Sequence, residues 1–230
     1  MKRVLVSENI SKACCDALVE LGYKVIKLPP FDRLQKGVSS HADMLCFYRD
    51  GCLVTHRDYY SKNRELFDGL GVRLVLSDEK IKAEYPYDVL FNAVLTNDGV
   101  LFSKTVSTSK YIKEISLECV EVKQGYTSCS TCRVDDRAFI TSDIGLYKSY
   151  SEKGIDCLLI SAGSITLPEY DTGFIGGSSV VLSDKVCFFG KVENHPDYKK
   201  IKEFIEKTNK TLVSLSDEKL TDIGGGIVLL

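Results

Sequence analysis

A few side chains in the sequence have the types and spacing that chemistry requires. Cys129 and Cys132 form a Cys-x-x-Cys pair, a spacing that can lower a thiol pKa or bring two thiolates onto one metal ion. His41 and Asp43 lie two residues apart in a polar stretch and offer an acid/base group and an orienting carboxylate. One hypothesis is therefore hydrolysis of a carbon–nitrogen bond, with Cys129 or Cys132 as the nucleophile.

The other hypothesis for the cysteine pair is that both thiols are structural. No second cysteine pair and no nearby histidine completes a set of four zinc ligands around Cys129 and Cys132. The pair also precedes an expected strand, whereas a thioredoxin-like pair opens a helix. We therefore expect no metal and no cofactor, and we assign no residue firmly as catalytic.

Composition narrows the classes of function. The 230 residues include 30 basic and 32 acidic side chains, so no bulk positive field favours a nucleic acid or an anionic membrane as partner. Apolar runs end after a few residues, well short of the ~20 that a membrane span needs. The N-terminus has no secretory signal pattern, and several of the nine cysteines lie in apolar runs. We expect a cytoplasmic protein without a disulfide framework.

Internal repeats predict the architecture. Short turn signals between apolar strands occur at Asp50-Gly51, Asp98-Gly99, Asp136-Arg137 and Asp184-Lys185, which are 48, 38 and 48 residues apart. Each turn predicts a β-hairpin. Joining the two ends of the chain gives a fifth interval of 48 residues, with Gly226–Leu230 as the strand that pairs with the N-terminal strand.

Each hairpin is followed by a helix and a third strand. The expected helices cover residues 7–21, 57–70, 107–114, 142–153 and 195–208, and the expected third strands cover residues 24–28, 72–76, 117–122, 157–161 and 212–215. We predict an α/β fold of five ββαβ modules in one domain of residues 1–230, closed into a ring by pairing of the terminal strands. The modules are residues 224–230 with 1–38, then 39–84, 85–126, 127–172 and 173–223. The alternative is a set of unrelated α+β units with coincidental spacing.

Three local strings carry a resemblance to a known family. They are the segment from Asn92 to Asp98, the string Gly176-Gly177-Ser178 and the string Gly224-Gly225-Gly226. In this order, with the five modules, the whole chain resembles the pentein or α/β-propeller fold of the guanidino-group-modifying superfamily. That superfamily includes arginine and agmatine deiminases, dimethylarginine hydrolases and amidinotransferases. The resemblance implies thiolate attack on an amidino carbon, a histidine acid/base and carboxylates that clamp the guanidinium.

The sequence differs from the family at the positions of the catalytic residues. The family's terminal histidine and cysteine match Val228 and Leu229, and the aspartate of its Gly-Gly-Asp string matches Ser178. Its His-x-Asp motif falls near residues 128–130, where this chain has no histidine. We therefore predict that the chain does not carry out the family's reaction.

The channel of such a ring is the expected ligand site. The residues six positions before each turn are Met44, Asn92, Ser130, Ser178 and Gly226, and a shift of one residue exchanges them for Asp43, Phe91, Cys129, Gly177 and Gly225. From these sets we predict ligand contacts at Asp43, Asn92, Ser130, Ser178 and Gly226.

Three functional hypotheses follow. The first is a divergent, non-catalytic pentein that binds a small polar ligand, similar to an amino acid or a guanidine, in the channel. The second is a carbon–nitrogen hydrolase or amidinotransferase-like enzyme with a relocated cysteine nucleophile. The third is a protein-binding or ribosome-binding scaffold, so the sequence does not exclude a protein partner.

Overall fold

The four Asp-led turns each close an antiparallel hairpin, and a parallel third strand completes each sheet. The computed structural model describes residues 2–229 and contains five three-stranded sheets. Their strands are β15 (Gly226–Leu229), β1 (Arg3–Ser7) and β2 (Lys24–Leu28); β3 (Cys46–Arg49), β4 (Cys52–His56) and β5 (Arg73–Ser77); β6 (Val94–Leu95), β7 (Val100–Ser103) and β8 (Glu118–Glu121); β9 (Thr131–Asp135), β10 (Ala138–Thr141) and β11 (Asp156–Leu159); and β12 (Ser179–Leu182), β13 (Lys185–Phe188) and β14 (Thr211–Ser214).

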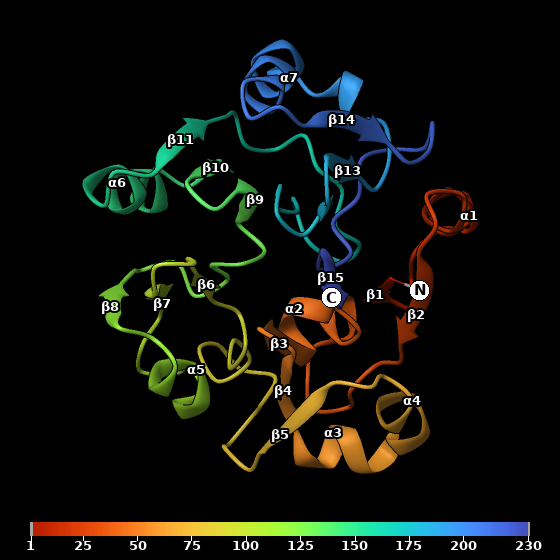
Figure 1. The fold of residues 1–230 in the computed structure, drawn as a ribbon, viewed down its shortest axis with the longest axis vertical. Helices are drawn as coiled ribbons and strands as arrows, with labels where there is room; N and C mark the ends of the chain where they lie inside the picture. The colour runs from red at the N-terminus through yellow and green to blue at the C-terminus, as the bar shows by residue number, and fades with distance from the viewer. Residues whose placement is uncertain (1, 230) are drawn as a thin grey trace.

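The sheets surround a common axis, with helices on the outside (Figure 1). The helices are α1 (Lys12–Glu20), α2 (Ala42–Leu45), α3 (Arg57–Lys62), α4 (Arg64–Asp68), α5 (Lys110–Glu114), α6 (Ile144–Glu152) and α7 (Tyr198–Glu206), with 3-10 turns at Lys36–Val38 and Val192–Asn194. The predicted five-module α/β-propeller is confirmed.

The two ends of the chain meet in one sheet, as the fifth interval predicts. β15 pairs antiparallel with β1, from Arg3 opposite Leu229 to Val6 opposite Gly226. β1 then pairs in parallel with β2. This pairing satisfies the edge of β1 that would otherwise be unpaired.

The helices follow the predicted positions but are shorter than expected. Side-chain caps set two of the starts, because Ser11 accepts a hydrogen bond from the Cys14 N–H and Asp143 accepts one from the Leu146 N–H. The single helix predicted over residues 57–70 is two helices. Asn63 leaves helical geometry at φ −128° and ψ 30°, and its side-chain amide donates to the Tyr59 carbonyl.

Apolar faces of helices and strands meet in a layer between the sheets and the outer helices. α7 buries Ile201, Phe204 and Ile205 against strands of its own module, including Val186 and Phe188 of β13. None of the helices within residues 2–229 is both long and apolar enough to cross a bilayer.

The closing strand gives a direct test of the fold. Leu229 of β15 is 4% exposed and packs in the same core cluster as Leu5. We expect Leu229→Ala to lower the free energy of unfolding by about 2–5 kcal/mol, because it leaves a cavity in the core. Urea unfolding followed by circular dichroism measures the change.

Leu117→Ala is the matched control, because Leu117 is 88% exposed. We expect it to change the free energy of unfolding by about 0.5 kcal/mol or less. Equal stability of the Leu229→Ala protein and the wild type would contradict the claim that packing of the closing strand stabilises the fold.

Candidate functional site

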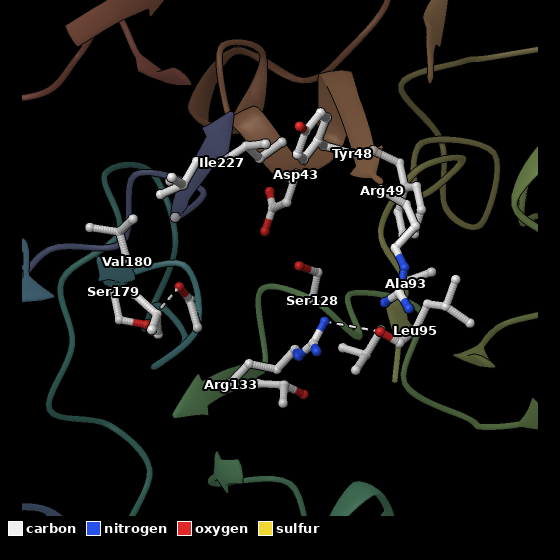
Figure 2. Close-up of a pocket in the computed structure, with 18 of the residues that line it drawn as sticks. Asp43, Tyr48, Arg49, Ala93, Leu95, Ser128, Arg133, Ser179, Val180 and Ile227 are labelled. Carbon is white, nitrogen blue, oxygen red and sulfur yellow. Dashed lines mark hydrogen bonds between the residues drawn. The ribbon is translucent and has the colours of Figure 1, made fainter. Parts of the chain in front are cut away.

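A cavity of about 460 Å³ lies at the centre of the ring. The first strand of every sheet contributes to its wall, namely β3, β6, β9, β12 and β15. Apolar side chains such as Val180 and Ile227 cover part of this wall, and polar side chains project from opposite sides (Figure 2). The channel of the ring is therefore a hollow with a mixed lining, as in many sites for small ligands.

Asp43 is the buried acidic side chain of the cavity wall, which also includes Asp135 and Asp136 at the β9 hairpin turn. It comes from α2, directly before β3, and its carboxylate points into the hollow toward Ser128 (Figure 2). Asp43 is 7% exposed, and its Oδ1 has no hydrogen-bond partner. An unpaired buried carboxylate oxygen is costly, so this atom is the clearest unsatisfied acceptor on the wall.

Two arginines lie on the same wall where the strands approach their hairpin turns. Arg49 ends β3 and donates from its two terminal nitrogens to Asn97. Arg133 lies inside β9 and donates to the Leu95 carbonyl at 2.9 Å and to Asp136 at 3.2 Å. Burial lowers the pKa of the Arg133 guanidinium, Asp136 opposes this and Arg49 adds to it. A guanidinium stays charged in a protein, so two cationic groups lie on this part of the wall. Each is also paired with an aspartate of its own hairpin turn, Arg49 with Asp50 and Arg133 with Asp136.

A buried polar cluster includes Asp43 and extends behind the wall. One ring nitrogen of His41, one carboxylate oxygen of Asp43 and the sulfur of Cys129 all lie within 4.8 Å of one another. The Cys129 thiol donates to Asp43 Oδ2 at 2.8 Å, and His41 Nδ1 has no hydrogen-bond partner. His41 and Cys129 are each 3% exposed. Residues 86 positions apart in sequence thus meet at one point.

Asn92 fixes the position of Cys129. Its Oδ1 accepts hydrogen bonds from the backbone N–H groups of Ser128 and Cys129, at 2.7 and 3.2 Å. Its Nδ2 lies 3.1 Å from Cys129 Sγ and 3.3 Å from the sulfur of Met44. The amide therefore holds both the backbone and the side chain of Cys129.

Asp222 closes the cluster on the side of His41. Its carboxylate accepts hydrogen bonds from the N–H groups of Gly224 and Phe174, each at 2.9 Å. Oδ1 lies 3.8 Å from His41 Nδ1. A side chain at Gly177 would overlap this carboxylate, and one at Gly224 would overlap His41. The two glycines thus allow Asp222 and His41 to pack directly against the backbone.

Burial disfavours the charged forms of these groups. It raises the pKa of Asp43 to about 8, with Cys129 opposing and Asp222 adding to the shift. Burial also raises the pKa of Cys129 well above its usual value, and Asp43 adds to this. Burial lowers the pKa of His41 to about 4 and raises the pKa of Asp222 to about 6. At neutral pH, Cys129 is a thiol and His41 is neutral, so the cluster holds no thiolate–imidazolium pair.

The structure places only some of the predicted ligand contacts on the cavity wall. Asp43 and Gly226 line it, whereas Asn92 lies one layer behind, beside Cys129. Ser130 is fully buried away from the wall, and Ser178 donates to the Ile175 carbonyl. Asn92, Ser130 and Ser178 thus lie off the wall of this cavity, and their contact with a ligand stays a prediction.

The reason for this difference is the late start of the first strands. Residues 42–45 form α2, and turns precede both β9 and β12. Strand alternation therefore does not apply at the positions that the sequence analysis compared. The one-residue shift toward Asp43 and Gly225 describes the wall better, since both lie on it.

The four candidate catalytic residues divide into three that meet and one that does not. Cys132 lies in β9 within an apolar cluster that includes Ile140 and Ile175, and burial raises its pKa to about 12. It forms no disulfide with Cys129. Only Cys129 of the Cys-x-x-Cys pair reaches His41 and Asp43.

Sequence reasoning missed Asp222 and the two arginines. Asp222 lies two residues before the Gly-Gly-Gly string, where an aspartate can accept the Gly224 N–H in a local turn. Arg133 lies between the buried residues Cys132 and Val134. A charge inside a buried strand is a signal that it faces a hollow or a partner.

The positions that match the family's catalytic pair carry no reactive group. Val228 lines the cavity, and Leu229 is buried in the core. An aliphatic side chain supplies neither a proton nor a nucleophile, so any chemistry in this cavity has to come from other residues.

The ring of five sheets and its central cavity define a pentein. Solved structures with this fold include three guanidino-modifying enzymes. A cysteine-to-serine mutant of DDAH from Pseudomonas aeruginosa, complexed with citrulline, is 10% identical with a TM-score of 0.56, over 99% of this chain and 98% of that chain. Agmatine deiminase from C. jejuni is 11% identical with a TM-score of 0.56, over 94% and 87%. The amidinotransferase SxtG from Microseira wollei is 10% identical with a TM-score of 0.55, over 100% and 94%.

Within this fold, the chain belongs to a family of unknown function (DUF6873), whose model matches residues 5–227. No curated protein matches the sequence. At 10–11% identity, the likeness to the three enzymes establishes the fold and leaves the function to the site itself.

The reactivity of Cys129 tests the state of the cluster. We expect iodoacetamide to modify Cys129 slowly in the folded protein at neutral pH, because the thiolate is the reactive form and burial raises its pKa. Cys119 is an exposed free thiol and serves as the internal control that reacts first. Mass spectrometry of peptides at successive times gives both rates. Modification of Cys129 as fast as Cys119 would contradict a neutral, buried thiol.

Proposed function

We propose that this protein binds a small polar ligand with two oppositely charged ends in its central cavity. The cationic end, an amine, amidine or guanidine, lies at Asp43, and the anionic end lies at Arg49 and Arg133. The observation that carries the proposal is the pairing of an unsatisfied buried carboxylate with two arginines on the wall of one cavity of about 460 Å³.

Charge complementarity favours such a ligand. A cation beside Asp43 favours the ionised carboxylate and accepts the interaction that Oδ1 lacks. Arg133 uses its two terminal nitrogens in the bonds to Leu95 and Asp136, and a guanidinium has five N–H groups in all. The remaining N–H groups are available for a carboxylate.

The dimensions favour a molecule of amino-acid size. Asp43 lies in α2, just before β3, and Arg49 ends β3. The strand itself spans roughly 10 Å at about 3.4 Å per residue, which sets the scale of the separation between the two charged groups. An amino acid with a long basic side chain has its charged ends at a comparable separation. A cavity of this volume also falls within the range of about 300–1,000 Å³ that is usual for small ligands.

The structural neighbours support the ligand class but not a reaction. One neighbour is a DDAH complexed with citrulline, and another is an agmatine deiminase. In this chain, Val228 and Leu229 stand at the positions that match the catalytic histidine and cysteine of the resembling family. We therefore propose recognition of the ligand without the family's reaction.

A second candidate function is hydrolysis of a carbon–nitrogen bond by Cys129. The observation in its favour is that Cys129, His41 and Asp43 converge within 4.8 Å. Against it, the thiol donates to Asp43, and Cys129 does not line the cavity. Release of ammonia or citrulline from arginine, agmatine or methylated arginines, abolished by Cys129→Ser, would establish it in place of the binding function.

The cytoplasmic location and the partners stay predictions. The nine cysteines are all free, which supports a reducing compartment. We expect no nucleic acid or membrane as partner, and a scaffold that binds a protein or a ribosome is the third candidate function.

Calorimetric titration tests the proposed function. We expect arginine or ornithine to bind, and agmatine, which lacks a carboxylate, to bind more weakly. Asp43→Asn and Arg133→Gln should each lower the affinity about 10- to 100-fold, because hydrogen bonds to charged groups contribute about 1.5–3 kcal/mol.

Arg137→Gln is the matched control for Arg133→Gln. Arg137 follows the same hairpin turn, but it pairs with Asp98 on the surface and does not line the cavity. Equal losses in the two arginine variants, or no binding of any zwitterion tested, would contradict the proposal.

A further inference from the structure

Three buried side chains carry metal-ligating atoms that point to one another. His41 supplies a ring nitrogen, Asp43 a carboxylate oxygen and Cys129 a sulfur, and these atoms all lie within 4.8 Å of one another. His41 Nδ1 and Asp43 Oδ1 are buried and without hydrogen-bond partners. Because such atoms are rarely left unpaired in a protein interior, they indicate a missing partner. We propose that His41, Asp43 and Cys129 bind a divalent transition-metal ion, with zinc as the best match.

The donor set favours zinc over magnesium or calcium. Zinc is bound by cysteine sulfur, histidine nitrogen and carboxylate oxygen, whereas magnesium and calcium take oxygen ligands. In a tetrahedral zinc site the donor atoms are about 3.4–3.6 Å apart. Cys129 Sγ and Asp43 Oδ2 are 2.8 Å apart with a proton between them. Once the proton has left, the two atoms need to move apart by less than about 1 Å to reach the spacing of two zinc ligands.

Charge balance favours a divalent ion. The thiol proton and the carboxyl proton leave to solvent as the sulfur–metal and oxygen–metal bonds form, and the two resulting anions neutralise the ion. The cluster is more than nine-tenths buried, where a neutral assembly costs far less than an isolated charge.

Neighbouring groups already hold the ligands in position. Asn92 Nδ2 lies 3.1 Å from Cys129 Sγ, where it can donate to a thiolate, and its Oδ1 fixes the backbone of residues 128 and 129. Asp222 Oδ1 lies 3.8 Å from His41 Nδ1, so its ionised carboxylate favours a cation bound at this nitrogen.

Asp43 gives the ion a route to the cluster, since it is also on the cavity wall. Three protein donors leave one of the four usual zinc positions for water or another ligand. The inference goes beyond the proposed function, because a metal ion and the cationic end of an organic ligand would be alternative partners of Asp43. Zinc should then weaken the binding of arginine.

Titration of Zn²⁺ into the reduced, chelator-treated full chain tests the site. We expect one ion per chain and a rise in melting temperature with zinc concentration. Co²⁺, used as a spectroscopic substitute, should give a thiolate-to-cobalt charge-transfer band. Both titrations are done without any organic ligand, and arginine binding is measured separately in the presence of a chelator, so that the two proposals can fail independently.

Variants assign the ligands. Cys129→Ser should abolish the cobalt charge-transfer band. It should also lower zinc affinity by more than about 100-fold, because loss of a residue that only hydrogen-bonds to a metal ligand already costs about 10- to 100-fold. Cys132→Ser is the matched control, because Cys132 is equally buried but outside the cluster; it should keep the band and the affinity. Asn92→Ala should lower zinc affinity by about 10- to 100-fold.

Two outcomes would overturn the proposal. One is the absence of a cobalt charge-transfer band in the folded wild-type protein. The other is an unchanged band in Cys129→Ser, or its loss in Cys132→Ser. If Cys129→Ser does not fold by circular dichroism, Asp43→Asn decides instead: a loss of zinc affinity of more than about 100-fold supports the site, and unchanged affinity overturns it.

Discussion

The ring depends on the antiparallel pairing of β15 with β1, because this contact closes the fold and also places the residues around the cluster. The segment that leads into β15 makes a series of backbone hydrogen bonds. Gly177 accepts from the N–H groups of Ile223 and Gly225, and its own N–H donates to the Cys129 carbonyl. The Asp43 N–H donates to the Gly224 carbonyl. Closing the ring therefore brings together three segments that are distant in sequence.

This geometry explains how the pentein fold can hold a central cavity with aliphatic residues at Val228 and Leu229. The fold supplies a hollow at the axis, and the side chains on its wall decide what happens there. Val228 and Leu229 satisfy the packing of the closing strand. Asp43, Arg49 and Arg133 come from other modules and keep the cavity polar. The closing strand thus carries aliphatic side chains while the cavity keeps charged side chains on its wall.

The fold could be predicted from the sequence because its information is local and repeated. The four turns and the terminal string Gly226–Leu230 fix the spacing of the modules, and the hairpin pairing follows from chain proximity. The helices lie where the sequence predicts them. Their ends differ from the predicted ends where a capping residue such as Ser11 starts a helix or a non-helical residue such as Asn63 interrupts one.

The site was less predictable, because it forms from contacts across the ring. The types of His41, Asp43 and Cys129 marked them as candidates, but nothing in their spacing shows that they meet. Asp222 gave only a weak local signal, an aspartate before a run of glycines. Ser130 and Ser178 lie off the cavity wall because turns replace the strand starts there, so the alternation of side chains does not apply.

The buried cluster departs from what stability alone would favour. An unpaired buried donor or acceptor costs about 1–3 kcal/mol, and both His41 Nδ1 and Asp43 Oδ1 are of this kind. Apolar side chains are accommodated nearby, as Val228 and Leu229 demonstrate on the closing strand. Burial also opposes every charge in the cluster. A cation from outside, whether a metal ion or the head of a ligand, would satisfy these atoms together, because it lets Asp43 ionise and neutralises the charge that burial penalises.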